Sequence, residues 1–219
     1  MRPSSTISHT LDEIAEFLKI ENNSGEIRVT GLTSNSKNVK PGDLFVALPG
    51  ASAHGLDYAS QAIEQGAVAI LSDRRSERLE APTLVVSNPR AELGRVASWF
   101  YGDPSRKVPI YGITGTNGKT TTSYLLFQIW QACGVQAGLI GTVGMQIGKE
   151  RFPALYTTPE ADELHSTFAT MVERGVRAIA MEVSSHALVQ NRVSGVHFRA
   201  AGYTNLTQDH LDFHKTMEN

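Results

Sequence analysis

Gly112-Ile113-Thr114-Gly115-Thr116-Asn117-Gly118-Lys119-Thr120-Thr121-Thr122 is the stretch of this 219-residue chain that decides its fold. An apolar run precedes it and a helical pattern follows, which is the strand, glycine turn and helix order of a phosphate-binding loop. Gly115 and Gly118 allow the backbone to approach an anion closely. We expect Lys119 to contact the outer phosphates and the Thr120 hydroxyl to hold Mg²⁺. The motif therefore predicts binding of a nucleoside triphosphate.

The spacing of the glycines departs from the strict Walker A pattern. That pattern needs glycine at position 113, where isoleucine stands, and Gly112 lies one residue too early. The alternative interpretation is a strand-to-helix turn that binds no ligand. A Gly-Lys-Thr sequence at the start of a helix argues against that alternative.

Composition restricts the class of protein. The formal net charge is −2, with 19% charged and 41% hydrophobic residues, which is typical of an ordinary globular protein. The tight basic cluster at residues 74–78 is interpreted as a solvated loop, so no nucleic-acid partner is expected. No signal core or membrane-spanning run is seen. The single cysteine, Cys133, excludes an internal disulfide, and its place on the apolar side of a helix predicts a buried thiol. We expect a cytoplasmic monomer with no membrane partner.

The periodicity predicts an α/β fold with two domains. Residues 1–103 form a small α/β domain, in which Thr10-Leu11-Asp12-Glu13 is a capping box that opens a helix. Residues 104–219 form an incomplete P-loop-type parallel-sheet domain with helices on both faces. Its expected strands lie at 108–111, 137–141, 177–183 and 200–206, and a hairpin is expected over 142–152.

Two segments beyond the glycine loop carry side chains suited to metal binding. Glu182 ends a buried strand, at the sheet edge where ligands bind in open parallel sheets, so it is predicted to hold Mg²⁺. The alternative is a carboxylate that caps the following helix. His210 and His214 lie one helical turn apart, which would allow a zinc pair or a surface pair. With a nucleotide loop upstream, contact of His210 with Mg²⁺ or the γ-phosphate is the preferred interpretation.

Three further segments have weaker signals. The Ser184-Ser185-His186 sequence invites a hydrolase interpretation, but no G-x-S-x-G elbow supports it. The hydroxyl-rich residues 156–158 precede a helix and could simply cap it. Arg192 offers a planar cation that can bind a carboxylate or a phosphate through two hydrogen bonds.

Taken together, these strings resemble the Mur ligase family. The resemblance rests on residues 112–122, Thr157-Thr158-Pro159-Glu160, residues 181–193 and residues 204–214, with Pro41-Gly42-Asp43-Leu44-Phe45-Val46-Ala47-Leu48 in the N-terminal part. The SSHAL and DHLDFH strings are closest to the MurE type, which adds a diamino acid to UDP-MurNAc-L-Ala-D-Glu. The resemblance covers essentially the whole chain from about residue 30 onward, but only part of the family's length.

The resemblance implies an ATP-dependent amide ligase of peptidoglycan synthesis. ATP, with Mg²⁺, phosphorylates the D-Glu side carboxylate, and the amine of L-lysine or meso-diaminopimelate then attacks the acyl phosphate. By resemblance, Lys119, Glu182 and His210 are catalytic, and Thr120, Glu182 and His210 contact the metal. The implied ATP-binding residues are Gly115, Thr116, Asn117, Gly118, Lys119, Thr120 and Thr121. The implied residues for UDP-MurNAc-dipeptide are Ser34, Ser36, Ala51, Ser52 and Ala53 at the uridine end, and Tyr156, Thr157, Thr158, Ser184, Gln190 and Arg192 at the muramoyl-dipeptide.

The chain departs from the family pattern at three places. Asn35-Ser36-Lys37 stands where the family has Asp-Ser-Arg, and Lys215 where it has Gly. The carbamylated lysine and the C-terminal amino-acid-binding domain are expected beyond Asn219, so we expect a truncated chain that is inactive alone. The alternatives are a nucleotide or UDP-sugar binding module without ligase activity, and a generic P-loop NTPase or kinase.

Overall fold

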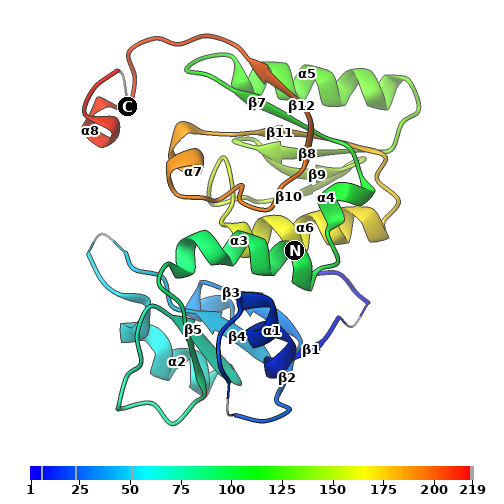
Figure 1. Ribbon diagram of the computed structural model, residues 1–219. Coiled ribbons are helices and arrows are strands. Elements are labelled where there is room, and N and C mark those ends of the chain that lie inside the picture. Colours follow the sequence, from blue (N-terminus) through cyan, green and yellow to red (C-terminus); the bar gives the residue numbers. More distant parts are fainter. Residues whose placement is uncertain (6, 23, 51, 218–219) are drawn as a thin grey trace. The chain divides into compact units, whose positions relative to one another are not determined.

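The computed structural model describes residues 1–5, 7–22, 24–50 and 52–217, which form two compact units (Figure 1). The first unit consists of Met1–Pro104 together with Glu160–Thr170 and Gln190–Val196. The second consists of Ser105–Pro159, Met171–Val189 and the described residues from His197 onward. Two short segments that follow the glycine loop in sequence thus belong by their contacts to the first unit. None of the helices in the described ranges has the length and apolar character needed to cross a bilayer.

The first unit is built on a parallel sheet. Its strands are, in spatial order, β3 (Gly31–Thr33), β4 (Asp43–Val46), β5 (Ala69–Ser72) and β6 (Thr83–Val85). A separate antiparallel pair joins β1 (His9–Thr10) to β2 (Arg28–Val29). The helical elements are α1 (Leu11–Leu18), η1 (Ser36–Asn38), η2 (Gly55–Tyr58), α2 (Ala59–Glu64) and α3 (Pro89–Phe100).

Both faces of this sheet are covered because successive side chains of a strand point to opposite sides. On β4, Leu44 and Val46 join the core cluster that contains residues of α1 and α3, whereas Phe45 joins the cluster that contains residues of α2. The capping box predicted for α1 is confirmed: the Thr10 hydroxyl accepts the Glu13 N–H at 3.2 Å, and the Glu13 carboxylate accepts the Thr10 N–H at 2.8 Å.

The second unit contains a six-stranded sheet of mixed direction. Its order is β10 (Glu150–Phe152), β9 (Gly144–Ile147), β8 (Ala137–Gly141), β11 (Ala178–Glu182), β7 (Ile110–Thr114) and β12 (Phe198–Tyr203). The last four are parallel, as predicted, while the expected hairpin adds β9 and β10 antiparallel to β8. The remaining helices along the chain are α4 (Pro104–Lys107), α5 (Lys119–Ala132), α6 (Ala161–Glu173), α7 (Ser185–Val189) and α8 (Leu211–His214).

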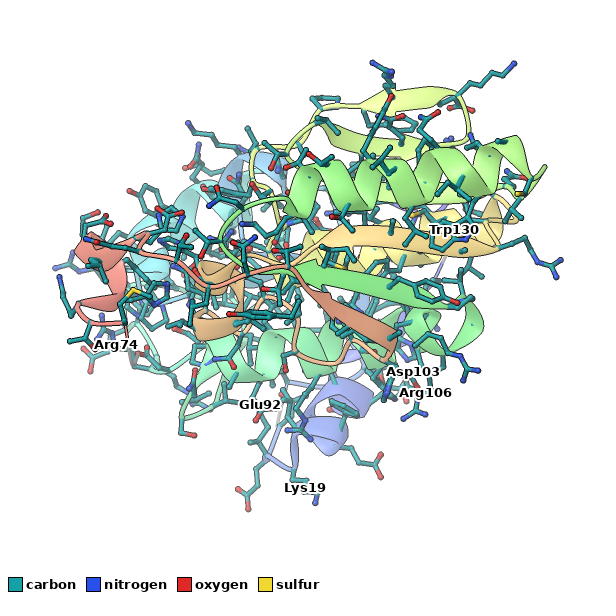
Figure 2. The ribbon with its side chains drawn as sticks, turned by 90° about the horizontal axis from the view of Figure 1, so that it is seen from above. Lys19, Arg74, Glu92, Asp103, Arg106 and Trp130 are labelled. Atoms are coloured by element: carbon teal, nitrogen blue, oxygen red, sulfur yellow. The ribbon has the colours of Figure 1, made fainter. Side chains whose placement is uncertain are left out.

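Helix α5 packs on this sheet along a narrower face than its sequence pattern indicates. Phe127 is buried with β8 and β11, and the Trp130 ring (labelled in Figure 2) lies 5.2 Å from the Tyr111 ring on β7. Ile129, by contrast, is 58% exposed. Cys133, four residues further along the same stripe, is exposed as well, so the prediction of a buried thiol is wrong. Residues 129 and 133 lie about 200° or more around the helix from Phe127, away from the strands.

Candidate functional site

The candidate site of the second unit lies where parallel strands end together. β7 pairs with β11 and β12 in a register that sets Glu182 opposite Ile113 and Tyr203 opposite Thr114. The glycine loop, the strand-end carboxylate and the residues after β12 therefore follow strands at one edge of the sheet. This is the edge at which open α/β sheets bind their ligands.

Two glycines shape the loop. Gly115 and Gly118 have φ angles of 127° and 85°, which side chains rarely tolerate. A Cβ atom on Gly115 would also lie 2.2 Å from the Thr204 hydroxyl, so no larger residue fits there. Gly118 caps α5 without a side-chain hydrogen bond. The first N–H groups of this 14-residue helix have no intrahelical acceptor, and its first residues line the pocket described below, so these donors suit an anion.

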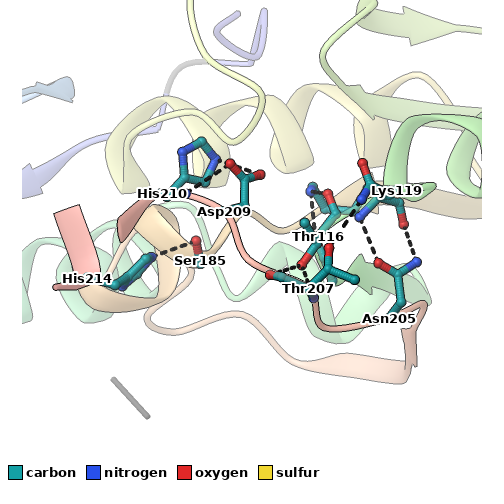
Figure 3. A network of polar contacts seen from close by, with 10 residues as sticks. Thr116, Lys119, Ser185, Asn205, Thr207, Asp209, His210 and His214 are labelled. Carbon is teal, nitrogen blue, oxygen red and sulfur yellow. Dashed lines mark hydrogen bonds and ion pairs between the residues drawn. The ribbon is translucent and has the colours of Figure 1, made fainter. Parts of the chain in front are cut away.

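The segment after β12 holds the loop in shape (Figure 3). The Thr116 N–H donates to the Asn205 carbonyl at 2.8 Å, and the Asn117 N–H donates to Asn205 Oδ1 at 3.0 Å. The Thr207 N–H donates to the Thr116 hydroxyl at 2.9 Å. Because these contacts use the N–H groups of Thr116 and Asn117, donors for an anion come mainly from the start of α5. Sequence reasoning did not assign Asn205 and Thr207 a role, although polar residues directly after a strand were the available signal.

Lys119 lies folded over the loop that precedes it. Its ammonium donates to the carbonyls of Gly115 at 2.6 Å and Thr116 at 2.8 Å. A phosphate that binds at the helix start would compete with these two carbonyls for the ammonium. In this structure the lysine ammonium therefore lies on the loop itself, close to where the outer phosphates are predicted to bind.

Glu182 is the fully buried carboxylate of the site. Its oxygens accept hydrogen bonds from the Thr120 hydroxyl at 2.8 Å, from the Thr142 N–H at 2.8 Å and from the Thr142 hydroxyl at 3.2 Å. It does not cap α7, since the Ser184 hydroxyl accepts the Ala187 N–H there at 3.2 Å. A carboxylate beside a hydroxyl at a phosphate loop is the oxygen donor set that Mg²⁺ prefers, so these residues fit a magnesium ion.

A pocket of about 520 Å³ opens at this edge of the sheet. The residues that line it include Gly115, Thr116, Asn117, Gly118, Lys119, Thr120, Thr142, Thr157, Glu182, Ser184 and His210. Thr121, Tyr156 and Thr158 do not line it. Thr158 instead supports the lining from behind: its buried hydroxyl donates to the Glu182 carbonyl at 2.9 Å and accepts the Ser184 N–H at 3.1 Å.

The two histidines of the C-terminal segment have different surroundings. His210 precedes α8 with a φ of 53°, and its ring lies 4.7 Å from that of His186 and 3.5 Å from the Asp209 carboxylate. His214 contacts the Ser185 hydroxyl at 2.8 Å. Within the part of the chain that the structure describes, no group of three His, Cys, Asp or Glu residues is arranged to hold a metal. The zinc-pair alternative therefore gains no support.

The residues predicted for the uridine end lie in the first unit. The N–H and the hydroxyl of Ser34 both donate to the Asp162 carboxylate, at 2.9 and 3.0 Å. Burial raises the pKa of this carboxyl, and the hydrogen bonds from Ser34 oppose the shift. The Ser36 hydroxyl donates to Gln61 at 2.9 Å. Of the small-residue loop, Ser52 is exposed, the Ala53 carbonyl accepts the Gly50 N–H at 3.1 Å, and Ala51 lies outside the described residues.

Gln190 and Arg192 also belong to the first unit. Arg192 donates to the Gln190 side-chain oxygen at 2.6 Å, and its Nε lies 3.1 Å from the Glu160 carboxylate. Arg90 reaches the same carboxylate at 3.3 Å. Burial raises the pKa of Glu160, and the two guanidinium groups oppose that shift. The sequence indicated Arg192 as an anion-binding side chain but gave no sign of Arg90, which lies about a hundred residues earlier.

Comparison with known proteins agrees with this geometry. The family model "Mur ligase middle domain" matches residues 113–219, and "Mur ligase family, catalytic domain" matches residues 28–101. The UDP-N-acetylmuramoyl-L-alanyl-D-glutamate--2,6-diaminopimelate ligase of Streptomyces coelicolor is 47% identical over 99% of this chain, which spans 44% of that relative's length.

Solved structures share the fold. A UDP-N-acetylmuramoyl-L-alanyl-D-glutamate--2,6-diaminopimelate ligase superposes with a TM-score of 0.78 at 27% identity, covering 98% of this chain and 43% of its own. MurF ligase from Thermotoga maritima in complex with ADP has a TM-score of 0.60 at 21% identity, covering 86% of this chain and 40% of its own. The chain thus spans less than half the length of the proteins it matches. With both family models matched in order along it, the chain belongs to the Mur ligase family.

Proposed function

We propose that this chain carries the nucleotide and UDP-sugar sites of an ATP-dependent ligase that adds a diamino acid to UDP-MurNAc-L-Ala-D-Glu in peptidoglycan precursor synthesis. The observation that carries the proposal is the buried Glu182 carboxylate bonded to Thr120 at the end of the glycine loop. The Streptomyces coelicolor relative is named for UDP-N-acetylmuramoyl-L-alanyl-D-glutamate and 2,6-diaminopimelate, which supports this substrate and favours 2,6-diaminopimelate over L-lysine as the acceptor.

The reaction needs activation because a carboxylate is a poor acyl donor. Transfer of the γ-phosphoryl group of ATP to the D-Glu side carboxylate breaks the bond to ADP and forms an acyl phosphate. Attack by the acceptor amine then forms the amide bond and releases inorganic phosphate and a proton. In phosphoryl transfer, protein groups contribute mostly by positioning and by charge neutralisation.

The side chains of the pocket have distinct roles in this proposal. The first N–H groups of α5 hold phosphate oxygens, and Lys119 exchanges the carbonyls of Gly115 and Thr116 for the outer phosphates. Thr120 and Glu182 would hold Mg²⁺, and His210, which also lines the pocket, would be a further contact. When bound, the ion neutralises charge on the reacting phosphate.

Each unit, taken by itself, offers side chains for the substrate in this proposal. In the second unit, Thr157 and Ser184 line the pocket and would contact the muramoyl-dipeptide. In the first unit, Gln190 and Arg192 are the side chains proposed for the muramoyl-dipeptide. Ser34, Ser36, Ser52 and Ala53 would contact the uridine end. Tyr156 and Thr158 contribute through their loop, since Thr158 fixes Ser184.

Calorimetric titration of this chain tests the proposal. We expect binding of ATP that Mg²⁺ strengthens, and separate binding of UDP-MurNAc-L-Ala-D-Glu. Lys119→Ala should weaken Mg·ATP at least tenfold and leave the UDP-sugar unaffected. Lys149→Ala, an exposed lysine of the β9–β10 turn, is the matched control and should bind both ligands normally. Tight ATP binding with no affinity for UDP-MurNAc-L-Ala-D-Glu would instead indicate a generic NTPase and refute the proposal.

A further inference from the structure

We propose that Arg90 and Glu160 are positioning residues for Arg192, and that their combined charge prepares this cluster to receive a carboxylate of the muramoyl-dipeptide. The inference rests on the proposed function, which assigns Arg192 and Gln190 to that part of the substrate. Arg90 and Glu160 are additional to that set. All four residues belong to the first unit.

The cluster is a carboxylate held between two guanidinium groups. Glu160 Oε1 lies 3.1 Å from Arg192 Nε, and Glu160 Oε2 accepts a hydrogen bond from Arg90 Nη1 at 3.3 Å. Gln190 accepts from the other end of the Arg192 guanidinium at 2.6 Å. The side chains of Arg90, Glu160 and Arg192 are 26%, 23% and 11% exposed. The hydrogen bond from Nη2 to Gln190 and the ion pair with Glu160 restrict where the Arg192 guanidinium lies, which favours a two-point contact with a carboxylate.

The backbone that carries Arg192 is also fixed. A Cβ on Gly94 of α3 would lie 2.4 Å from the Ser194 carbonyl, so helix and segment are in direct backbone contact. Ser98, one turn further along α3, donates to the Gly195 carbonyl at 3.1 Å. His165 of α6 contacts the Ser194 carbonyl at 2.9 Å. Arg192 therefore projects from a segment held by two helices, which reduces the entropy lost when a ligand binds.

Arg90 occupies a position that a cation ordinarily disfavours. It is the second residue of α3, whose N-terminus carries the positive end of the helix dipole. Glu160 offsets this cost. The nearby Asp162 carboxylate adds a negative charge, but backbone N–H groups and both donors of Ser34 solvate it.

The net charge of the cluster depends on both Arg90 and Arg192 pairing with Glu160. Arg192 with Glu160 alone would form a neutral pair, which attracts an anion weakly. With Arg90 the cluster carries a net charge of +1, while Glu160 still orients Arg192. A substrate carboxylate on Arg192 is then still attracted by the cluster, because the charge of Arg90 offsets the repulsion from Glu160. Both guanidinium groups reach the same carboxylate, so Arg90 lies within roughly 10 Å of an anion on Arg192, a range at which a unit charge changes affinity about tenfold.

Affinities of four variants for two ligands test the proposal by calorimetry. Arg90→Gln should weaken UDP-MurNAc-L-Ala-D-Glu about tenfold and leave UDP, which lacks the dipeptide carboxylates, within twofold of wild type. Adding Glu160→Gln to Arg90→Gln restores the +1 charge and keeps a side-chain oxygen beside Arg192, so it should recover most of the lost affinity. Arg90→Lys keeps the charge and should bind within threefold of wild type. Arg95→Gln, an exposed arginine of the same helix paired with Glu92, is the matched control and should bind normally.

Each contrary result has a distinct meaning. Normal dipeptide binding by Arg90→Gln overturns the inference, as does a double variant weaker than the single one, because a purely structural contact would not be rescued. Equal losses for UDP and the dipeptide ligand also overturn it, since the anion would then be the diphosphate. If the wild-type chain itself fails to bind UDP-MurNAc-L-Ala-D-Glu, the proposed function fails instead.

Discussion

Gly141→Ala should disturb the proposed magnesium site while the backbone keeps its fold. Gly141 ends β8, and a Cβ atom there would lie 2.1 Å from Glu182 Oε1 and 2.8 Å from its Cδ. Gly141 has no positive φ, so the backbone itself accepts alanine. The side chain of Glu182 cannot turn away without losing its hydrogen bonds to Thr120 and Thr142. The substitution therefore acts through the side chain of Glu182.

The magnitude follows from those hydrogen bonds. Each hydrogen bond to a charged group contributes about 1.5–3 kcal/mol, and overpacking costs about 1–3 kcal/mol. We expect the free energy of unfolding to fall by about 2–4 kcal/mol. If one contact that orients Glu182 toward Mg²⁺ is lost, the affinity for Mg·ATP should fall about 10- to 100-fold. ATP without Mg²⁺ should bind Gly141→Ala and wild type alike.

The assay is calorimetric titration with ATP in Mg²⁺ and in EDTA, beside urea unfolding. Gly138→Ala is the matched control, because its Cβ would meet the flexible end of Met171 at 2.7 Å, on the same strand but away from Glu182. It should lose some stability and keep normal Mg·ATP affinity. Mg·ATP affinity of Gly141→Ala within twofold of wild type would refute the role given to Glu182.

Three further predictions concern the two units separately. Burial raises the pKa of Tyr101 to about 12 from 10.0, so the stability that comes from its neutral phenol is present below pH 10 and is lost as the pH rises toward 12, by roughly 3 kcal/mol. Urea unfolding of Tyr101→Phe over this range should show a shallower loss, and an identical loss would contradict the assignment. Arg2 pairs with the fully buried Asp43 carboxylate, so Arg2→Ala should lower the free energy of unfolding by about 3 kcal/mol in urea, whereas a change under 1 kcal/mol would show that the pair is dispensable. The exposed Cys133 should react with a thiol reagent in the native protein, and a reaction that appears only after denaturant is added would contradict its exposure.

Local signals predicted the elements well. The capping box at Thr10, the strand 137–141 and the helix after Gly118 follow from short patterns, since caps, turns and periodicity act within a few residues. The positions of the glycine loop and of the strand-end carboxylate Glu182 were likewise predictable, because parallel strands bring their carboxyl ends to one edge of the sheet.

Long-range contacts were not predictable in the same way. Nothing in the sequence around Arg90 indicates Glu160, and nothing near Ser34 indicates Asp162, which lies 128 residues away. The exposure of Cys133 also depends on which face of α5 meets the strands. Tertiary packing decides such pairings, and a single sequence carries no record of it.

The dependence of the glycine loop on Asn205 has a consequence for synthesis of the protein. The Asn117 N–H and its acceptor on Asn205 are 88 residues apart, so translation at about 5–20 residues per second separates their appearance by roughly 4–18 s. Strand β12, which lies beside β7, is also made late. On a translating ribosome, the loop therefore exists for seconds with its N–H groups exposed to water. Ordering of the nucleotide pocket is a late event, completed only after Thr207 has left the exit tunnel.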